Sequence, residues 1–283
     1  MGIKKYIKKV FRFLHNPPQR KITTNIISLA PSELLRSRLA LITGGTSGIG
    51  YSIAEAFLNA GADIIITGRD RVRIEKVIQS LNKIRSDAKI TGLVLDNSNI
   101  EEATITLNKL LETTDVDILV NNAGINGGML RTCSEDEYQA VMDTNLKGAV
   151  FISRIISENM IKKGIKGNIL NICSSSSNRP ANTAYVLSKW GMRGYTLGLS
   201  KTLIKYGIVV NGLAPGPTAT PMLLKGDRTD ISLPNNPSGR YTLPEEIANM
   251  AVVLTSGLGR MIVGDIIYMT GGAGVITFDD INY

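Results

Sequence analysis

The feature that most constrains the fold is a repeated alternation of short apolar runs with stretches long enough for a helix. From about residue 38 onward there are seven such runs: LALIT (39–43), DIIIT (63–67), ITGLVL (90–95), DILVN (117–121), NILNIC (168–173), IVVNGL (208–213) and DIIYMT (265–270). Unbroken apolar runs are typical of parallel strands covered on both faces, and the segments between them are long enough for right-handed crossovers. The sequence therefore predicts an α/β fold: a single-domain, doubly wound, seven-stranded parallel sheet with helices on both faces.

The length of the chain fits one large domain preceded by an arm. A chain of 283 residues can bury the core of a single α/β domain, and no linker, low-complexity stretch or internal repeat divides it after residue 38. We therefore expect an N-terminal arm over residues 1–37 and one domain over residues 38–283.

The cysteines, the single histidine and the hydropathy exclude several classes of protein. Cys133 and Cys173 are far apart and form no C-x-x-C pair, and His15 is the only histidine, so we expect neither a disulfide framework nor a metal site. This use of cysteine fits a reducing compartment. No apolar run approaches the roughly 18 residues of a membrane span, and the N-terminus lacks the apolar centre of a signal peptide. We expect a cytoplasmic protein.

The positive charge of the chain is concentrated in its first 38 residues. The formal net charge is +8, and this segment holds nine lysines and arginines against one acidic residue, so the remainder is balanced. We therefore expect no nucleic-acid binding. In residues 1–16, Ile3, Ile7, Val10 and Leu14 share one helical stripe opposite the cations, which predicts a basic amphipathic helix. Such a helix could make peripheral contact with an anionic membrane, bind a partner, or pack on its own domain or a neighbouring subunit.

A glycine-rich turn follows the first predicted strand. A doubly wound sheet binds its ligand beyond the carboxyl ends of its strands, and the segment TGGTSGIG lies at such an end, directly before the helix-length stretch YSIAEAFLNAG. Glycines there let the backbone approach a pyrophosphate, whose charge is stabilised by the N-terminus of the following helix. We expect six residues of this turn to bind a dinucleotide: Gly44, Thr46, Ser47, Gly48, Ile49 and Gly50.

The residues after the second predicted strand bear on the choice of dinucleotide. A carboxylate in this position usually binds the free 2′-hydroxyl of NAD, whereas a 2′-phosphate requires a cation. The strand ends in TGRDR, where Arg69 favours NADP(H). Asp70 lies 20 residues beyond Gly50, close to where an acidic ribose ligand is expected, so NAD(H) remains an alternative.

Polar and small residues follow the other predicted strands and are expected at the same edge of the sheet. The third strand ends in LVLDNSN, the fourth in VNNAG and the fifth in four serines, Ser174–Ser177, and a Pro-Gly turn follows the sixth. Asn145 lies in the helical stretch MDTNLKGAVF, where helix propensity does not favour an amide. Further candidates for contacts with the dinucleotide are Asp96, Asn97, Asn122, Ala123, Gly124, Pro215, Gly216, Thr218 and Thr220.

Tyr185 and Lys189 stand four residues apart in the stretch AYVLSKWGMRG. If this stretch is helical, the two side chains share one face, about a turn apart. A free phenol has a pKa of about 10, and a nearby cation lowers the pKa of a phenol toward the range where proton transfer is efficient. The pair is therefore a candidate acid with its cationic partner, although an exposed lysine beside a packed tyrosine has the same spacing.

Taken in order along the chain, these motifs resemble the short-chain dehydrogenase/reductase family. TGGTSGIG, NNAG, the Asn145 segment, a serine after the fifth strand, YVLSK and the Pro-Gly turn occur in family order, and the resemblance covers residues 38–276. It implies a Rossmann fold and hydride transfer between NAD(P)(H) and a carbonyl or secondary alcohol. By this resemblance Tyr185 exchanges the proton and Lys189 binds the nicotinamide ribose and tunes the acid. Ser174 binds the reacting oxygen, and Asn145 holds a water-linked proton relay.

Two departures from the family pattern leave assignments open. The family serine most often precedes its tyrosine by about a dozen residues or slightly more, whereas Ser174 precedes Tyr185 by 11. Ser175 or Ser176 could take the role if the shorter loop shifts the register. Many NADP-dependent relatives carry a basic residue where this chain has Ser47, which weakens the preference for NADP(H) without reversing it.

The sequence does not select a substrate. Residues 217–241, which should cover the substrate, mix apolar and charged side chains. The C-terminal part resembles 3-oxoacyl-[acyl-carrier-protein] reductases and their relatives among sugar and polyol dehydrogenases, so we expect a reductase of the first kind, with the second kind as the alternative. A less favoured alternative is a non-catalytic dinucleotide-binding scaffold that works through its basic arm.

Two further expectations concern partners. Lys162, Lys163 and Lys166 could dock an acidic carrier protein that bears the substrate, or they could form a solvated helix end. The resemblance also implies a homotetramer or homodimer.

Overall fold

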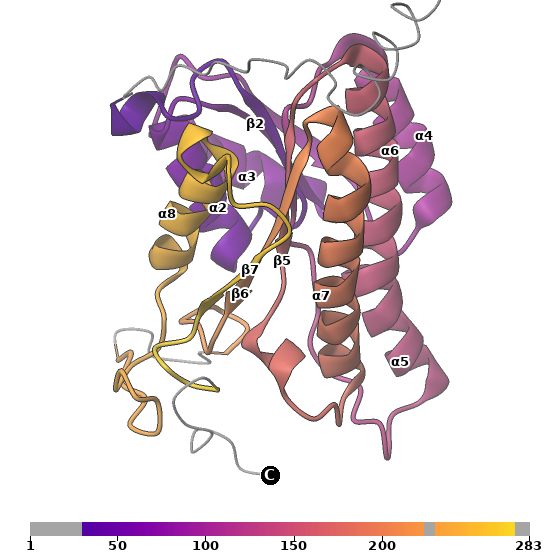
Figure 1. Cartoon of the computed structure of the whole chain (residues 1–283), viewed down its shortest axis with the longest axis vertical. Helices are drawn as coiled ribbons and strands as arrows, with labels where there is room; N and C mark the ends of the chain where they lie inside the picture. The colour runs from indigo at the N-terminus through magenta and orange to yellow at the C-terminus, as the bar shows by residue number, and fades with distance from the viewer. Residues whose placement is uncertain (1–29, 224–229, 275–283) are drawn as a thin grey trace, which may run out of the picture. The chain divides into compact units, whose positions relative to one another are not determined.

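All seven predicted strands form, and they lie in one parallel sheet. The computed structural model describes residues 30–223 and 230–274. The strands are β1 (Leu39–Ile42), β2 (Asp63–Gly68), β3 (Ile90–Val94), β4 (Ile118–Asn121), β5 (Asn168–Ile172), β6 (Val209–Pro215) and β7 (Ile266–Met269). Their order is β3-β2-β1-β4-β5-β6-β7, and every neighbouring pair runs parallel (Figure 1). The predicted doubly wound, seven-stranded fold is confirmed.

The strand order reverses beside β1. From β1 the chain moves outward through β2 to β3, and it then returns to place β4 on the other side of β1. Leu41 thereby pairs with Ile65 of β2 and with Leu119 of β4. The loops that leave β1 and β4 diverge at this point, and the crevice between them is where a doubly wound sheet binds its ligand.

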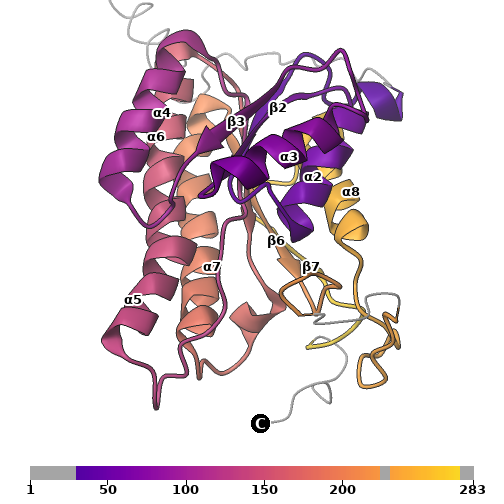
Figure 2. The same cartoon turned by 180° about the vertical axis from the view of Figure 1, so that it is seen from behind.

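Helices cover both faces of the sheet (Figures 1 and 2). α2 (Gly48–Asn59), α3 (Arg71–Leu81) and α8 (Pro244–Thr255) lie on one face, and α4 (Ile100–Thr113), α6 (Gly148–Lys163) and α7 (Ala184–Leu203) lie on the other. α5 (Glu135–Met142) leads through the π-helical segment η2 (Asp143–Lys147) into α6. Short 3-10 turns complete the described elements: η1 (Pro31–Glu33), η3 (Ser175–Asn178), η4 (Ile204–Tyr206) and η5 (Gly257–Gly259).

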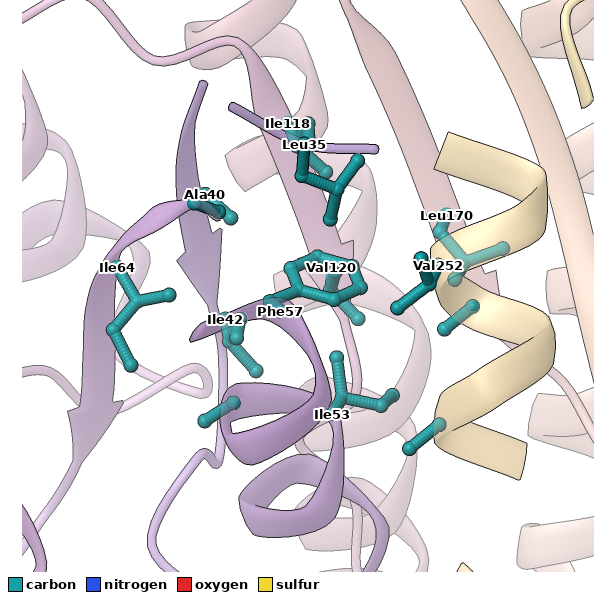
Figure 3. Close-up of a cluster of buried hydrophobic side chains, with 14 of the residues drawn as sticks. Leu35, Ala40, Ile42, Ile53, Phe57, Ile64, Ile118, Val120, Leu170 and Val252 are labelled. Carbon is teal, nitrogen blue, oxygen red and sulfur yellow. The ribbon is translucent and has the colours of Figure 1, made fainter. Parts of the chain in front are cut away.

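Two apolar clusters fix the helices onto the sheet. Successive residues of a strand point to opposite faces, so Ala40 and Ile42 of β1 enter one cluster while Leu41 enters the other. In the first cluster the fully buried Phe57 of α2 lies among side chains of β1, β4 and α8 (Figure 3). Burial of a side chain of this size stabilises the fold by about 1.5–3 kcal/mol. Because both faces are covered, the strands are apolar without alternation.

The packed sheet domain begins at Pro31, before the boundary expected at residue 38. Leu35 is fully buried in the first apolar cluster, and its amide donates to the carbonyl oxygen of Ala60 at 2.8 Å. Residues 31–37, grouped with the arm on sequence alone, therefore pack with the domain. The amphipathic helix predicted in residues 1–16 lies outside the described residues.

Two findings concern membranes and metals. Within the described ranges, no helix is long and apolar enough to cross a membrane. The same residues contain no group of three or more histidine, cysteine, aspartate or glutamate side chains placed to hold a metal ion.

Candidate active site

One cavity at the carboxyl edge of the sheet brings most of the candidate residues together. It has a volume of about 800 Å³ and is lined by residues that end or follow β1 to β6. Of the sequence candidates, all but Gly50 and Asn145 line it: Gly44, Thr46, Ser47, Gly48, Ile49, Arg69, Asp96, Asn97, Asn122, Ala123, Gly124, Ser174, Tyr185, Lys189, Pro215, Gly216, Thr218 and Thr220.

Glycines shape the turn between β1 and α2. Gly44 and Gly48 have φ angles of +64° and +54°, in the left-handed region that favours glycine. Gly50 is buried and does not line the cavity. A Cβ at this position would collide with the side-chain amide of Asn122 and lie 2.5 Å from the carbonyl oxygen of Gly44, so the close packing here requires glycine. The turn and the N-terminus of α2 thus form a cradle that fits the phosphates of a dinucleotide.

Asn122 ties this turn to the end of β4. Its Nδ2 donates to the carbonyl oxygens of Thr43 at 2.9 Å and Gly44 at 3.1 Å. In return, Oγ1 of Thr43 accepts from the backbone amides of Asn122 and Ala123, at 3.0 and 3.1 Å. These hydrogen bonds connect the two loops that flank the crevice between β1 and β4. Asn122, which the sequence predicts as a cofactor contact, therefore also stabilises the structure of the crevice.

Two arginines line the cavity beside the end of β2. The sequence predicts Arg69 there, but Arg73, in the first turn of α3, is not among its candidates. Asp70 is the N-cap of α3, and its Oδ1 accepts from the amides of Val72 at 2.9 Å and Arg73 at 3.2 Å. One oxygen of the Asp70 carboxylate is therefore used to cap α3. This weakens the case that Asp70 binds the ribose 2′-hydroxyl of NAD. The sequence signal for Arg73 was a third cation, two residues beyond the end of TGRDR.

The loop after β3 presents Asp96 and Asn97 to the same end of the cavity. Oδ1 of Asp96 accepts from the amide of Ser98 at 2.9 Å and from its hydroxyl at 2.7 Å. These bonds hold the turn that leads into α4 and fix the position of Asn97.

Asn145 is buried beneath the cavity wall. It lies in η2, where the π-helical turn widens the helix between α5 and α6. Its Oδ1 accepts from the amide of Ile125 at 2.8 Å, and its Nδ2 donates to the carbonyl oxygen of Ile125 at 2.9 Å and to Oγ of Ser188 at 3.1 Å. Asn145 therefore links the loop after β4 with α7, next to Lys189. The water-linked relay implied by the family stays a prediction.

α7 carries Tyr185 and Lys189 one turn apart. The helix begins after Thr183, whose Oγ1 accepts from the amide of Val186 at 3.1 Å, so Tyr185 lies in the first turn. Lys189 is 6% exposed, and its Nζ donates to the carbonyl oxygen of Ile172 at 2.7 Å. The same nitrogen lies 5.7 Å from the centre of the Tyr185 ring. The bond to β5 fixes the ammonium beside the phenol, and an ammonium has two further N–H groups to donate.

The four serines after β5 divide into two roles. Ser174, Ser175 and Ser176 line the cavity, whereas Ser177 is fully buried and its hydroxyl donates to the carbonyl oxygen of Ser174 at 2.7 Å. Oγ of Ser174 accepts from the amide of Ser176 at 3.1 Å, which leaves its own O–H to donate to a ligand. Cys173 shares this wall, and burial raises the pKa of its thiol, so the thiol is neutral.

The loop over residues 175–184 is held on two sides. The hydroxyl of Tyr268 donates to Oδ1 of Asn178 at 2.9 Å, and Nε1 of Trp190 donates to the carbonyl oxygen of Arg179 at 2.8 Å. These contacts come from β7 and α7, and they fix the backbone from which the side chain of Arg179 lines the cavity.

Several cavity residues are not among the sequence candidates. They include Arg73, Ile125, Arg179, Thr183, Val186, Met222, Leu223, Leu233 and Tyr241. Most lie in loops whose positions depend on tertiary packing, so periodicity gives no signal for them. Met222, Leu223, Leu233 and Tyr241 fall in the segment expected to cover the substrate, of which residues 224–229 lie outside the described ranges.

The model of the short chain dehydrogenase family matches residues 38–230 of this chain. The chain belongs to the short-chain dehydrogenase family. A 3alpha-hydroxysteroid dehydrogenase of Mediterraneibacter gnavus is 31% identical to it, over 85% of this chain and 98% of the relative. A 3-oxoacyl-[acyl-carrier-protein] reductase of Chlamydia muridarum is 34% identical, over 85% of this chain and 99% of the relative.

Solved structures give the same result. The structure of a gluconate 5-dehydrogenase from Burkholderia cenocepacia J2315, in complex with NADP and tartrate, has a TM-score of 0.77 and 29% identity. The match covers 86% of this chain and 97% of the chain of the B. cenocepacia enzyme. This short-chain dehydrogenase is therefore an oxidoreductase, as its motifs predict. The three relatives differ in substrate, so similarity at this level does not assign one.

Proposed function

We propose that this short-chain dehydrogenase interconverts a carbonyl and a secondary alcohol, prefers NADP(H), and uses Tyr185 to donate and accept the proton. The observation that carries the proposal is the position of Tyr185, one turn before the buried Lys189 in a cavity that Ser174 also lines. A phenol, a fixed cation and a hydroxyl donor at one wall are the groups that a carbonyl oxygen needs when it gains a proton.

The residues at the carboxyl edge of the sheet fit a dinucleotide. The left-handed glycines Gly44 and Gly48 open the turn before α2 to a pyrophosphate. Arg69 and Arg73 supply two cations for a 2′-phosphate, and Lys189 has N–H groups for the nicotinamide ribose. When bound, the dinucleotide supplies or accepts the hydride. The NADP in the B. cenocepacia relative supports the preference, and NAD(H) is the alternative.

The protein side chains handle the proton. In reduction, the hydroxyl of Tyr185 donates its proton to the carbonyl oxygen while Ser174 donates a hydrogen bond to the same atom. Lys189 stabilises the resulting phenolate by its charge. In oxidation, the phenolate accepts the proton of the alcohol. Asn145 is a positioning residue here, since its amide is bonded to Ile125 and to Ser188.

We propose a 3-oxoacyl compound as the first candidate substrate. Val186, Met222, Leu223 and Leu233 give the cavity an apolar wall that suits a hydrocarbon chain, and the C. muridarum relative is a 3-oxoacyl-[acyl-carrier-protein] reductase. A sugar acid is the second candidate, supported by the tartrate in the B. cenocepacia relative. A 3-oxosteroid is a third, because the M. gnavus relative is a 3alpha-hydroxysteroid dehydrogenase.

The proposal is tested by NADPH consumption with 3-oxoacyl thioesters, keto sugars, a 3-oxosteroid and simple ketones. We expect turnover of at least one class, and we expect Tyr185→Phe to lower kcat by about 10²–10⁴-fold at unchanged NADPH affinity. Tyr206→Phe is the matched control, because Tyr206 is exposed and outside the cavity. Turnover that survives Tyr185→Phe would contradict the mechanism, and NADPH binding without any turnover would favour the scaffold alternative.

Partners and location stay proposals. For carrier-protein docking, Lys163 offers little support, because its Nζ donates to the carbonyl oxygen of Leu111 at 3.1 Å and pairs with Asp115, as expected of a helix end. We retain a homotetramer or homodimer, and a cytoplasmic location, as predictions from the family resemblance and the sequence.

A further inference from the structure

We propose that Tyr268 of β7 is a positioning residue for the reaction, because it holds the serine turn in the arrangement that presents the hydroxyl of Ser174 to the reacting oxygen. The serine turn is the segment from Ser174 to Asn178, which contains η3. Tyr268 itself does not line the cavity, so its effect passes through this turn. The inference rests on the oxidoreductase function proposed above and adds a residue to its machinery.

The serine turn has more than one hydroxyl that could face the substrate. Only the ten residues 175–184 separate Ser174 from Tyr185, and Ser174, Ser175 and Ser176 all line the cavity. Serines favour turns, but their short side chains can bond to several neighbouring backbone groups. The choice of the hydroxyl that reaches the reacting oxygen therefore depends on how the turn is held.

Within the turn, Ser174 is bonded at its side chain and at its backbone. Its Oγ accepts from the amide of Ser176 at 3.1 Å. Its carbonyl oxygen accepts from the amide of Ser177 at 3.0 Å and from the hydroxyl of Ser177 at 2.7 Å. Ser177 is fully buried. The orientation of Ser174 is therefore set by the position of Ser177, near the far end of the turn.

Tyr268 holds this far end from the sheet. Its hydroxyl donates to Oδ1 of Asn178 at 2.9 Å and lies 3.4 Å from Oγ of Ser177. The tyrosine is itself fixed, because it pairs with Ala214 of β6 and packs against the apolar cluster that contains Cys173, the residue before Ser174. The sheet thus supports both ends of the serine turn, and rigid elements position functional groups more precisely than loops do.

The advantage of this contact is an arrangement that exists before the substrate binds. A turn that samples several arrangements must lose conformational entropy when the substrate arrives. A hydroxyl already at its working position stabilises the charge that develops on the oxygen without further reorganisation. Since one hydrogen bond contributes a modest net free energy, its loss should change the rate by about 2- to 10-fold.

The first test removes the hydroxyl of Tyr268 and keeps its ring. We expect Tyr268→Phe to lower kcat by about 2- to 10-fold with every substrate that turns over, at an unchanged dissociation constant for NADPH. Tyr195→Phe is the matched control. Tyr195 packs against the same apolar cluster, but its hydroxyl donates to the carbonyl oxygen of Val150 at 3.2 Å, away from the serine turn. This control should keep the kcat of the wild type.

Variants of Asn178 test the other partner of the hydrogen bond. Asn178→Asp keeps an oxygen that accepts from Tyr268 and should retain most of the wild-type kcat. Asn178→Ala removes the acceptor and should match Tyr268→Phe. The double variant Tyr268→Phe/Asn178→Ala should be no slower than either single variant, because both substitutions remove the same bond. Losses that multiply in the double variant would contradict the role of this bond.

A double-mutant cycle with Ser174→Ala separates positioning from general damage. Once the Ser174 hydroxyl is absent, its position no longer affects the rate. Tyr268→Phe should therefore change the kcat of Ser174→Ala by less than about twofold. A merely structural role of Tyr268 would lower kcat by the same factor with and without the Ser174 hydroxyl, and that result would overturn the inference.

Hydrogen exchange distinguishes failure of this inference from failure of the proposed function. The amides of Ser176, Ser177 and Arg179 are bonded within the turn, so mass spectrometry of a peptide over 174–183 measures its opening without any turnover. Faster exchange there in Tyr268→Phe, with α4 unchanged, supports the inference even if no substrate reacts. Unchanged exchange, or wild-type kcat in both Tyr268→Phe and Asn178→Ala, overturns the inference and leaves the oxidoreductase function intact.

Discussion

At the scale of single residues, Lys189 is held by more than its helical spacing from Tyr185. Its Nζ donates to the carbonyl oxygen of Ile172, the last residue of β5, so the sheet as well as the helix fixes the ammonium. Ordering a long side chain costs up to about 2 kcal/mol of conformational free energy. The hydrogen bond offsets this cost before a dinucleotide binds, and two N–H donors are then available at a fixed position.

The pair of arginines after β2 predicts the cofactor preference. Arg69 and Arg73 line the cavity while Asp70 caps α3. Arg73→Gln removes one charge-assisted contact to the 2′-phosphate and should raise the KM for NADPH about tenfold. The double variant Arg69→Gln/Arg73→Gln removes both contacts and should raise this KM about 100-fold. The KM for NADH should not rise, because NADH has no 2′-phosphate. Steady-state kinetics with both dinucleotides measures this.

Arg71→Gln provides the control for that experiment, because Arg71 begins the same helix but does not line the cavity. Its KM for NADPH should equal that of the wild type. A parallel rise of both KM values in Arg73→Gln would show that the substitution disturbs the turn and would contradict recognition of the 2′-phosphate.

Residues of the site differ in how far the sequence could predict them. Tyr185 and Lys189 share one helix, so their spacing alone fixes their proximity. Arg179 and Arg73 were missed because their access to the cavity depends on how a loop and a helix start pack against other strands. Asp70 was open to two interpretations: its Oδ1 caps α3, a common role for aspartate before a helix, and the residue also lines the cavity, so its part in the choice of dinucleotide stays a prediction.

At the scale of elements, the first turn of α2 and the loop after β4 form one unit. Asn122 donates to Thr43 and Gly44, and Gly50 of α2 packs against the same amide. The glycine motif therefore serves two purposes, since Gly44 and Gly48 supply positive φ angles while Gly50 supplies space. The motif predicted a close approach of backbone to cofactor, but the approach of Asn122 needs the strand order and could not be predicted from spacing.

Gly50→Ala tests this unit. The added methyl group would collide with the amide of Asn122, and overpacking of this kind costs about 1–3 kcal/mol of unfolding free energy. We expect a loss of this size in urea unfolding, together with weaker NADPH binding in a fluorescence titration, because the cradle must shift.

The matched control for this glycine is Gly194→Ala in the interior of α7, where a Cβ meets nothing within 4 Å. It should be neutral or stabilise the helix by up to about 1 kcal/mol. Wild-type stability and NADPH affinity in Gly50→Ala would contradict the close packing of the unit.

At the scale of the whole molecule, the strands were predictable and their order was not. Each strand is an apolar run that can be recognised from its own residues. The order β3-β2-β1-β4-β5-β6-β7, in contrast, depends on pairings between distant segments. The start of the domain at Pro31 was also not predictable, because it too depends on a contact between distant segments. Leu35 packs with the domain through its hydrogen bond to Ala60, and no local pattern reveals this contact.

Global stability should depend on pH through Glu246 at the start of α8. Hydrogen bonds from Arg240, at 2.7 and 2.9 Å, and then from the amide of Leu243, at 2.8 Å, lower the pKa of this carboxyl to about 2 from its ordinary value of 4.5. A carboxylate whose pKa falls on folding stabilises the folded state above its unfolded pKa, and this contribution is lost as the pH falls toward 2.

We therefore expect Glu246→Gln to lower the unfolding free energy at pH 7 by about 0.5–1 kcal/mol, a modest value because the pair is solvent-exposed. The deficit should shrink below pH 4.5 as the wild-type carboxylate takes up its proton. Urea unfolding of both proteins at pH 7, 5 and 3.5 measures it. Glu245→Gln removes a charge from the same turn and controls for the helix dipole. If the two variants lose equal stability at every pH, the dipole and not Arg240 explains the effect, because only Glu246 bonds to the arginine.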